Sequence, residues 1–368
     1  MRITFVLASG FGLSGGERTI AQWANHLHLR GHQVLVVSPA RPTLSPREHW
    51  RHWKRFDFQY LSTASHFDHV PVPRKLLETY RPVADADVPD ADFVIATWWE
   101  TAEWVAAFAP RKGIKVHLIQ HHEVFDYLPQ ARVAAVYRLP LHKIVIAPWL
   151  QVVMRERYGD ANATCIVQGI DRSQFDAPPR GKQKIPTFGF MYSPLRWKGC
   201  DVVLQALALA QKQIPHMQII VYGADRPTRT LPLPRGTHFV QRPAQNMLHE
   251  LYAQCDAWLF GSRAEGFALP PMEAMACRTP VIGTRAGGEA ELITQGGMLV
   301  ARDDAAAMAQ HMREIAEMDE AKWRAVSDKA YAAVAPYTWE RATDQFETAL
   351  HEIAVRAQHR AAPQFEHG

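Results

Sequence analysis

Short apolar runs alternate with segments of helical pattern along most of the chain. The first half contains the runs ITFVLAS, QVLVVS, FVIAT, KVHLIQ and KIVIAP, and the second half contains TFGFMY, MQIIVYG, AWLFGS and PVIGT. An apolar run followed by a helix and a further apolar run is typical of the βαβ unit, which builds a parallel sheet. The alternation therefore predicts an α/β protein whose strands lie in parallel sheets.

A break in this alternation divides the chain in two. The stretch FDAPPRGKQKIP at 175–186 is rich in Pro, Lys and Gly and has the composition of a linker. A chain of 368 residues is also too long for one ordinary hydrophobic core. We therefore expect two Rossmann-like domains that face each other across a cleft. The expected parts are an N-terminal domain at 1–175, a linker at 176–186, a C-terminal domain at 187–337, a helix at 338–356 and a disordered tail at 357–368.

Composition narrows the class of protein. Hydrophobic residues make up 47% of the chain and charged residues 21%, as in soluble globular proteins. No apolar run approaches the roughly 20 residues needed to span a bilayer, and we interpret the opening MRITFVLASG as a buried strand rather than a signal peptide. The four cysteines lack CxxC or paired spacing, which argues against a disulfide framework and a zinc site and favours a cytoplasmic protein.

The segment SRAEGFALPPMEAMACRTPVIGTRAGGEAELI, at 262–293, carries the strongest functional pattern. Glu265 lies in the loop that leaves a predicted strand, and Glu273, eight residues later, begins the next predicted helix. Ligands of open parallel sheets bind at the carboxyl ends of the strands. Carboxylates there can hold pairs of hydroxyl groups through charge-assisted hydrogen bonds. A double glycine such as Gly287-Gly288 lets backbone N–H groups approach a phosphate.

This segment resembles the signature of the retaining glycosyltransferases of family 4, which have the GT-B fold. The matching residues are Glu265, Gly266, Phe267, Glu273, Ala274, Met275, Ala276, Pro280, Val281, Ile282, Gly287 and Gly288. The resemblance implies that Glu265 contacts the donor sugar and that Glu273 holds the ribose hydroxyls of the nucleotide. It also places the turn Gly266-Phe267-Ala268 beside the sugar pocket. Ala268 stands where the family commonly has glycine, so the identity of the sugar stays open.

The resemblance extends to the loop SPLRWKGCD at 193–201. Lys198-Gly199 matches the family's lysine-glycine pair, whose lysine neutralises the diphosphate. A fixed cation suits this role because the departing nucleoside diphosphate gains charge. Arg196 lies closer to the lysine than the family's arginine does, so it either substitutes for that arginine or points to solvent. Backbone N–H groups near Gly287-Gly288 are expected to hold the diphosphate as well.

The loop SGFGLSGGER near the N-terminus permits two interpretations. Gly10, Gly12 and Gly15 form a G-x-G-x-x-G, which marks a dinucleotide site when an acidic residue closes the second strand. That strand ends here without an acid, and Arg41 follows it, so an NADP enzyme using Arg41 stays open. The alternative is the opening of family 4, whose double-glycine loop is matched by Gly15-Gly16 and would border the donor phosphates and the acceptor.

Two histidines and a glutamate, His121, His122 and Glu123, follow the predicted strand KVHLIQ. Adjacent histidines in a loop rarely chelate one metal together, and the sequence offers no evident third ligand. The family often has a histidine here that contacts the donor sugar, and we favour His121 over His122 for that contact. The other interpretation is a pair of surface histidines.

Two acidic pairs, Asp85-Ala-Asp87 and Asp90-Ala-Asp92, are similar to the DxD motif that carries a metal in the other glycosyltransferase fold. They lie in a proline-flanked loop before a predicted strand, and family 4 needs no essential metal. We therefore interpret them as solvated acids and expect neither a metal nor another cofactor.

The segment REHWRHWKRF at 47–56 combines basic and aromatic residues in a chain of net charge +4. This combination suits an interfacial helix on an anionic membrane or the binding of a lipid-linked diphosphate acceptor. A helix whose tryptophans pack inward fits the pattern equally well. We expect no nucleic-acid partner, because no motif for one is recognised.

Together these features predict a metal-independent, retaining GT-B glycosyltransferase, a hexosyl- or deoxyhexosyl-transferase of surface polysaccharide or glycoconjugate synthesis. The nucleotide-sugar donor would bind the C-terminal domain, and a glycan, lipid-linked or small-molecule acceptor would bind the N-terminal domain. The enzyme would be cytoplasmic, with a peripheral position at the inner face of the membrane left open. By the resemblance, the helix at 338–356 would cross back to the N-terminal domain. The alternatives are an NADP-dependent oxidoreductase, a sugar-nucleotide epimerase of the same fold and a non-catalytic nucleotide-sugar binding module.

Overall fold

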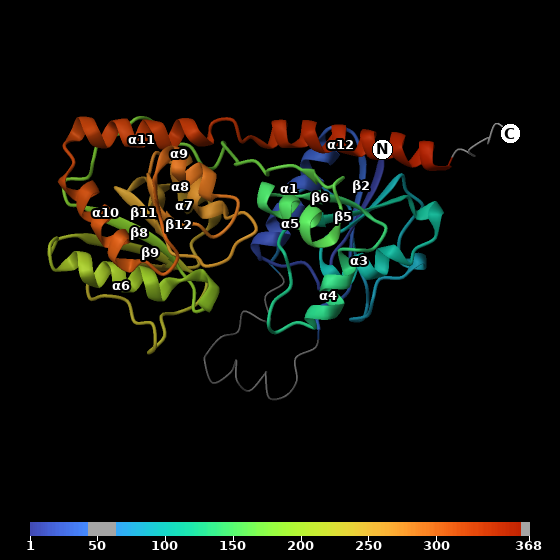
Figure 1. Cartoon of the computed structure of the whole chain (residues 1–368), viewed down its shortest axis with the longest axis horizontal. Helices are drawn as coiled ribbons and strands as arrows, with labels where there is room; N and C mark the ends of the chain where they lie inside the picture. The colour runs from blue at the N-terminus through green and yellow to red at the C-terminus, as the bar shows by residue number, and fades with distance from the viewer. Residues whose placement is uncertain (43–63, 362–368) are drawn as a thin grey trace. The chain divides into compact units, whose positions relative to one another are not determined.

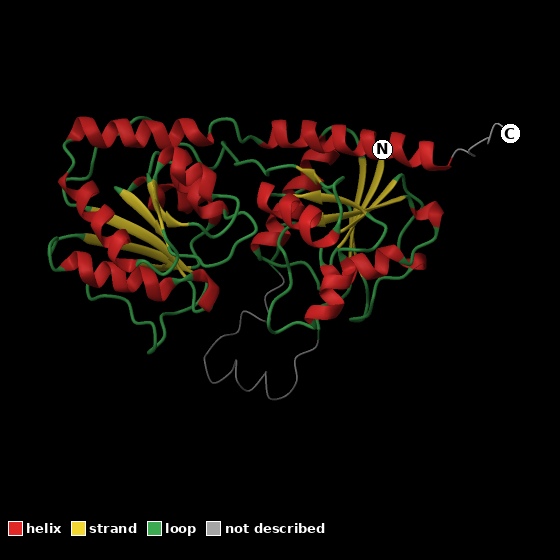
Figure 2. Cartoon of the chain, viewed as in Figure 1, coloured by secondary structure: helices red, strands yellow, loops and turns green. Residues whose placement is uncertain are grey.

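The structure, a computed structural model, describes residues 1–42 and 64–361. The chain divides into two compact units (Figure 1), the first formed by residues 1–168 and 342–368 and the second by residues 169–341. Each unit has a parallel sheet with helices on both of its faces (Figure 2). The predicted α/β class with parallel sheets is therefore confirmed.

Over the described residues, the sheet of the first unit has seven strands in the order β3-β2-β1-β4-β5-β6-β7, and all of their pairings are parallel. The strands are β1 (Arg2–Val6), β2 (Gln33–Ser38), β3 (Arg74–Leu76), β4 (Phe93–Ala96), β5 (Ile114–Ile119), β6 (His142–Val145) and β7 (Thr164–Cys165). β1 lies inside the sheet, and its residue Ile3 lies opposite Val34 of β2 on one side and Phe93 of β4 on the other.

The helices of the first unit cover the faces of this sheet. They are α1 (Gly15–Leu29), α3 (Trp99–Ala106), α4 (Gln130–Val136) and α5 (Pro148–Tyr158), together with most of α12 (Trp339–Ala361). α1 begins at a capping box, in which Glu17 N donates to Ser14 Oγ and Ser14 N donates to the Glu17 carboxylate. This cap places Gly15 and Gly16 in the first turn of the helix.

The second unit, all of whose residues are described, repeats the same plan. Its six-stranded parallel sheet has the order β10-β9-β8-β11-β12-β13. The strands are β8 (Thr187–Tyr192), β9 (Gln218–Gly223), β10 (His238–Gln241), β11 (Ala257–Phe260), β12 (Val281–Thr284) and β13 (Met298–Val300). The helices are α6 (Cys200–Gln211), α7 (Leu248–Ala253), α8 (Leu269–Ala276), α9 (Ala290–Gly296), α10 (Ala305–Glu317) and α11 (Glu320–Val334).

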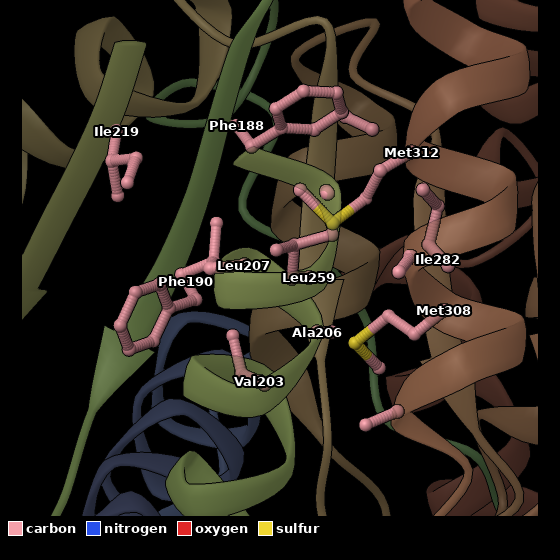
Figure 3. Packing of buried hydrophobic residues seen from close by; sticks show 14 of the residues in the cluster. Phe188, Phe190, Val203, Ala206, Leu207, Ile219, Leu259, Ile282, Met308 and Met312 are labelled. Atoms are coloured by element: carbon pink, nitrogen blue, oxygen red, sulfur yellow. The ribbon is translucent and has the colours of Figure 1, made fainter. Parts of the chain in front are cut away.

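A hydrophobic core lies between the second sheet and two of its helices, α6 and α10 (Figure 3). Strands contribute Phe188 and Leu259, and the helices contribute Leu207 and Met312, all of them almost completely buried. Burying a large apolar side chain stabilises the fold by about 1.5–3 kcal/mol. This core fixes the strands whose carboxyl ends carry the predicted donor site.

The predicted linker, 176–186, lies in the second unit and is bonded to it. Arg180 donates to Cys255 O at 2.5 Å and to Thr279 Oγ1 at 2.8 Å. The Asp256 carboxylate accepts from the backbone of Gln183 at 2.8 Å. The segment is therefore fixed against the start of β11.

The last helix, α12, leaves the second unit and packs in the first. Phe346 contacts Trp23 of α1 with 4.7 Å between ring centroids, and Arg30 pairs with Asp344 and Glu347. The helix continues to Ala361, beyond the predicted end at 356, because the residues after 356 keep a helical composition.

Candidate active site

The second sheet has a topological switch point between β8 and β11. The chain moves outward from β8 to β9 and β10 on one side, then returns to β11 and continues to β12 and β13 on the other. Loops after two such neighbouring strands leave in opposite directions, and ligands of open α/β sheets bind in the crevice between them. Here the loop after β8 carries Lys198, and the loop after β11 carries Glu265.

The structure brings Lys198 and Glu265 together. Lys198 Nζ lies 2.9 Å from Glu265 Oε1 and 3.0 Å from Oε2, and Ser262 Oγ donates to Oε1 at 2.7 Å. The side chains are 25% and 12% exposed, so the pair is reachable from solvent yet partly shielded. Lys198, predicted to neutralise the diphosphate, and Glu265, predicted to contact the donor sugar, therefore pair with each other in this structure.

A close backbone contact keeps these two loops together. Gly199 has φ +60°, a conformation that favours glycine, and a Cβ there would lie 1.8 Å from Gly261 O. Arg263 N also donates to Trp197 O at 2.7 Å. Lys198 and Glu265 are thus neighbours because the backbones beside them touch.

Arg263, in the loop after β11, connects that loop to Asp201 of α6 and to Asp303. Its guanidinium donates to both carboxylate oxygens of Asp201, at 2.9 and 2.7 Å, and to Asp303 at 2.6 Å. The bond to Asp201 raises the pKa of Arg263 above its ordinary value. Arg263 also donates to the backbone carbonyl of Arg196, whose own side chain is exposed. Sequence reasoning named Arg196 and missed Arg263, although Arg263 lies inside the segment that it singled out.

The double glycine lies against the turn that follows Glu265. Gly288 N donates to Gly266 O at 3.2 Å, and Gly287 N donates to Glu289 Oε1 at 2.7 Å. The N–H groups predicted to hold the diphosphate thus already donate within the protein. A phosphate would reach them by displacing a carbonyl or a carboxylate.

Glu289 is a buried carboxyl group that sequence reasoning did not assign to the site. It is fully buried, and its Oε2 accepts from Ala268 N at 3.3 Å while Oε1 accepts from Gly287 N. Burial, with a smaller contribution from the charge of Glu265, raises the pKa of Glu289 to about 7. Its carboxyl group bridges the turn after β11 and the turn after β12.

Glu273 lies in α8 and is 2% exposed. The hydroxyl of Tyr252, from α7, donates to Glu273 Oε2 at 2.8 Å, and the hydroxyl of Tyr222, at the end of β9, lies 2.8 Å from that of Tyr252. Phe267 and Ala268, predicted to border the sugar, are 8% and 4% exposed. No sequence signal indicated Tyr252, because a contact between two helices has no fixed spacing.

At Gly10, the glycine loop of the first unit is in contact with the side chain of Arg41, whereas the space around Gly15 is open. A Cβ at Gly10 would lie 2.4 Å from Arg41 Cγ, and Arg41 donates to Phe11 O. Arg41 therefore occupies the space beside Gly10 that a pyrophosphate would need. At the helix start, a Cβ at Gly16 would reach Gln120 at 3.6 Å.

The two histidines follow β5, as predicted, and have different surroundings. His121 Nδ1 lies 3.0 Å from His122 O, and its ring contacts Phe125 and Trp149. His122 Nε2 lies 2.7 Å from the hydroxyl of Tyr158, and burial lowers the pKa of His122 to about 4. His122 is therefore neutral near pH 7 and bonded inward.

Glu123 is buried beside these histidines. It accepts from Trp99 N, the first residue of α3, at 2.9 Å, and burial raises its pKa well above the ordinary value. Its carboxyl group thus fixes the loop after β5 to the start of α3.

The acidic pairs at 85–92 were interpreted as solvated acids. The side chains of Asp90 and Asp92 are 53% and 42% exposed, in agreement with this interpretation, and the structure corrects it for Asp87. Each of the four carboxylates has a cationic partner, and Asp87 is 9% exposed. The pairs are Asp85 with Arg111, Asp87 with Arg81, Asp90 with Lys112 and Asp92 with Arg2. These ion pairs link the loop before β4 to neighbouring segments of the first unit.

The basic and aromatic segment 47–56 lies outside the described residues. Within residues 1–42 and 64–361, none of the helices combines the length and the apolar character needed to cross a bilayer.

Comparison with known proteins identifies a matching family and similar proteins. Residues 182–318 match the model of the family described as Glycosyl transferases group 1. A D-inositol 3-phosphate glycosyltransferase of Corynebacterium urealyticum is 30% identical over 173 residues, which are 43% of this chain and 41% of that protein. The matched region therefore spans less than half the length of this relative.

Solved structures resemble almost the whole chain. Sucrose-phosphate synthase from Thermosynechococcus elongatus has a TM-score of 0.70 at 17% identity, covering 97% of this chain and 100% of that one. HepE from Anabaena, crystallised with UDP and glucose, has a TM-score of 0.73 at 19% identity, covering 95% and 99%. The predicted GT-B fold is thus confirmed, and residues 182–318, which lie in the second unit, match the family of glycosyl transferases group 1.

Proposed function

We propose that this chain is a retaining glycosyltransferase that moves a sugar from a nucleotide-sugar to a hydroxyl group of a glycan, lipid-linked or small-molecule acceptor. The observation that carries the proposal is the Lys198–Glu265 pair at the switch point of the second sheet. It places a cation and a carboxylate at the position where open α/β sheets bind nucleotides.

The two charges have complementary roles toward such a donor. Lys198 stabilises the diphosphate, which gains charge as it departs, and Glu265 accepts hydrogen bonds from the sugar hydroxyls. Because they pair with each other at 2.9 Å, donor binding replaces their mutual contact with contacts to the ligand. The similar HepE binds UDP and glucose in its crystal structure, which supports a donor of this class.

The reaction proceeds without a protein nucleophile. The acceptor oxygen attacks the anomeric carbon on the face from which the diphosphate leaves, and the bond from that carbon to the phosphate oxygen breaks. The hydroxyl proton passes to the leaving phosphate, so the anomeric configuration is retained. The charge of Lys198 supplies the stabilisation that a metal ion gives in other enzymes, so the reaction needs no metal.

The first unit receives the acceptor, and His121 contacts the donor sugar. The product belongs to surface polysaccharide or glycoconjugate synthesis. A membrane-bound acceptor would give the basic segment 47–56 a role at an anionic surface.

The decisive experiment is a thermal-shift screen against UDP, GDP, ADP and dTDP, followed by turnover of the matching nucleotide-sugars. One nucleoside diphosphate should raise the melting temperature, because a ligand that binds the native state stabilises it. NMR of the product should then show an unchanged anomeric configuration. A protein that binds none of the four, or a product of inverted configuration, would refute the proposal.

The same screen separates the alternatives. An epimerase would convert the nucleotide-sugar without an acceptor, and a binding module would bind it without turnover. An NADP enzyme would be stabilised by NADPH, but Arg41 already contacts Gly10 in the glycine loop that such a cofactor needs.

A further inference from the structure

We propose that Tyr252 is a positioning residue for nucleotide recognition, whose hydroxyl fixes the Glu273 carboxylate so that it can receive the ribose diol. The inference rests on the proposed function and on the assignment of the ribose hydroxyls to Glu273 that the resemblance to family 4 implies. It goes further by identifying what holds that carboxylate in place. The expected consequence is a preference for ribose that depends on a tyrosine which does not contact the ligand.

The contact between the two residues is short and shielded from water. Tyr252 is fully buried, Glu273 is 2% exposed, and the hydroxyl lies 2.8 Å from Oε2. Burial, and secondarily the charge of Glu273, raises the pKa of Tyr252 well above its ordinary value. The hydroxyl therefore keeps its proton at neutral pH and is a lasting donor to the carboxylate.

The direction of the hydrogen bonds follows from the chemistry of the groups. Tyr252 donates its single hydroxyl proton to Glu273 Oε2. The bond between the two tyrosine hydroxyls, 2.8 Å long, must then be donated by Tyr222. A directed chain results, from Tyr222 to Tyr252 to Glu273, and each bond polarises the next.

The ring of Tyr252 is held by aromatic neighbours. Its centroid lies 4.5 Å from that of Trp258 and 6.1 Å from that of Phe175, both in edge-to-face geometry, and 6.0 Å from that of Tyr222. Such contacts lock the ring, so the hydroxyl has a fixed position. Through it, β11 and β9 determine where the carboxylate on α8 points.

A fixed orientation matters because a diol must meet its acceptor at two points. A carboxylate has about four lone-pair sites, and Tyr252 uses one of them. Losing this bond leaves the carboxyl group in place but removes the constraint that the Tyr252 hydroxyl puts on its orientation. The loss should therefore affect ligands that carry the ribose hydroxyls and spare ligands that lack them.

The test compares a nucleoside diphosphate with its 2′,3′-dideoxy analogue by isothermal titration calorimetry, using the nucleotide that stabilises the wild type in the thermal-shift screen. The wild type should prefer the ribose form by at least roughly tenfold, since a hydrogen bond to a charged group contributes about 1.5–3 kcal/mol. Tyr252→Phe should reduce that preference several-fold and leave the affinity for the dideoxy analogue near its wild-type value.

Tyr192→Phe is the matched control. Tyr192 is a buried tyrosine of the same unit, and its hydroxyl donates to Leu231 O at 3.1 Å rather than to a carboxylate. Its substitution can lower the melting temperature but should leave the preference for ribose unchanged. Tyr222→Phe, one bond further from Glu273, should give a smaller loss of preference than Tyr252→Phe. Tyr222→Phe also tests the directed chain of hydrogen bonds if Tyr252→Phe fails to fold.

Three results would overturn the inference. An equal loss of affinity for both nucleotides in Tyr252→Phe would indicate a structural residue. An unchanged preference in both Tyr252→Phe and Tyr222→Phe would show that the carboxylate needs no such support. If the wild-type protein binds both nucleotides equally, the assignment of the ribose hydroxyls to Glu273 is wrong. If it binds neither nucleotide, the proposed function itself is refuted.

Discussion

The carboxyl edges of the two sheets are built in different ways. In the second unit, charged side chains join one loop to the next, as Lys198 joins Glu265 and Arg263 joins Asp201 and Asp303, in addition to the backbone contacts of the buried Glu289. In the first unit, the loops are fixed through backbone groups. Arg41 donates to Phe11 O, and Glu123 accepts from Trp99 N.

Under the proposed function, this difference would divide the work of the transferase between two copies of one architecture. Where ion pairs are partly exposed, as between Lys198 and Glu265, an anionic ligand can replace the carboxylate as the partner of the cation. Both edges contain a buried carboxyl group with a raised pKa, Glu123 in the first unit and Glu289 in the second, so the partly exposed ion pairs are what distinguishes the second edge. Substitutions at both edges and a chelation experiment, ordered from the largest expected effect to the smallest, can show whether this contrast in charge is a functional difference.

Removal of the central cation should have the largest effect. Lys198→Ala should lower turnover by about 100-fold or more, the range found when one preorganised electrostatic group is lost. Affinity for the nucleoside monophosphate should change less, because the charge acts on the departing diphosphate. Steady-state kinetics with calorimetry measures both. Unchanged turnover together with unchanged diphosphate affinity would reduce Lys198 to a surface charge.

Glu289 should make stability depend on pH. Its pKa is raised to about 7, with Glu265 as the charged neighbour, so the folded state binds a proton that the unfolded state has released above its ordinary pKa near 4.5. The associated stability is full below about pH 4.5 and is lost as the pH rises through 7, on the order of 3 kcal/mol. Glu289→Gln should flatten this part of the profile in denaturant unfolding. Identical slopes in both proteins would contradict the assignment.

Loss of the ribose carboxylate should weaken nucleotide binding itself. Glu273→Ala removes a charged acceptor for the diol, which corresponds to about 1.5–3 kcal/mol, so affinity should fall roughly tenfold or more. Calorimetry with the free nucleoside diphosphate checks this, and Glu291→Ala, at another glutamate of the same unit, is the control. A dissociation constant equal to that of the wild type would remove Glu273 from the site.

A substitution in the first unit should have a smaller effect. His121→Ala should lower turnover about two- to tenfold, the effect of one ordinary hydrogen bond, and should leave affinity for the nucleoside diphosphate unchanged. His122→Ala is the comparison, since His122 is bonded to Tyr158 and faces inward. If His121→Ala lowered turnover as much as Lys198→Ala does, the proposed difference in function between the carboxyl edges of the two sheets would be wrong.

Chelation should have the smallest effect of all. Activity should survive EDTA, because Lys198 supplies the charge that a metal would otherwise provide. The measurement is turnover before and after dialysis against the chelator. Complete loss, restored by manganese, would refute the metal-free mechanism.

The sequence predicted the central strands and missed the edges of both sheets. The nine predicted runs include β1, β8 and β11, whose buried apolar residues give a clear pattern. The strands β3, β7, β10 and β13, which end the two sheets, were not predicted. They are short and partly exposed, so they lack the continuous apolar run that marks a buried strand.

The candidate site divides in a similar way. Lys198 and Glu265 were identified from local motifs, and the structure places them in contact. Tyr252 and Arg263 depend on which helices and loops meet, and no spacing in one sequence encodes such a meeting. Local chemistry was therefore predictable, and the partners that orient it were not.

The touching backbones of Gly199 and Gly261 have a consequence for anyone who wishes to redesign this protein. A Cβ at Gly261 would lie 2.7 Å from Gly199 O, so neither position has room for a side chain. The loop after β8 and the loop after β11 are therefore closely packed at Gly199 and Gly261, and larger side chains at these two positions are not a route to altered donor specificity. We expect Ala268, which the resemblance to family 4 places beside the sugar pocket, to be a more suitable position for variation.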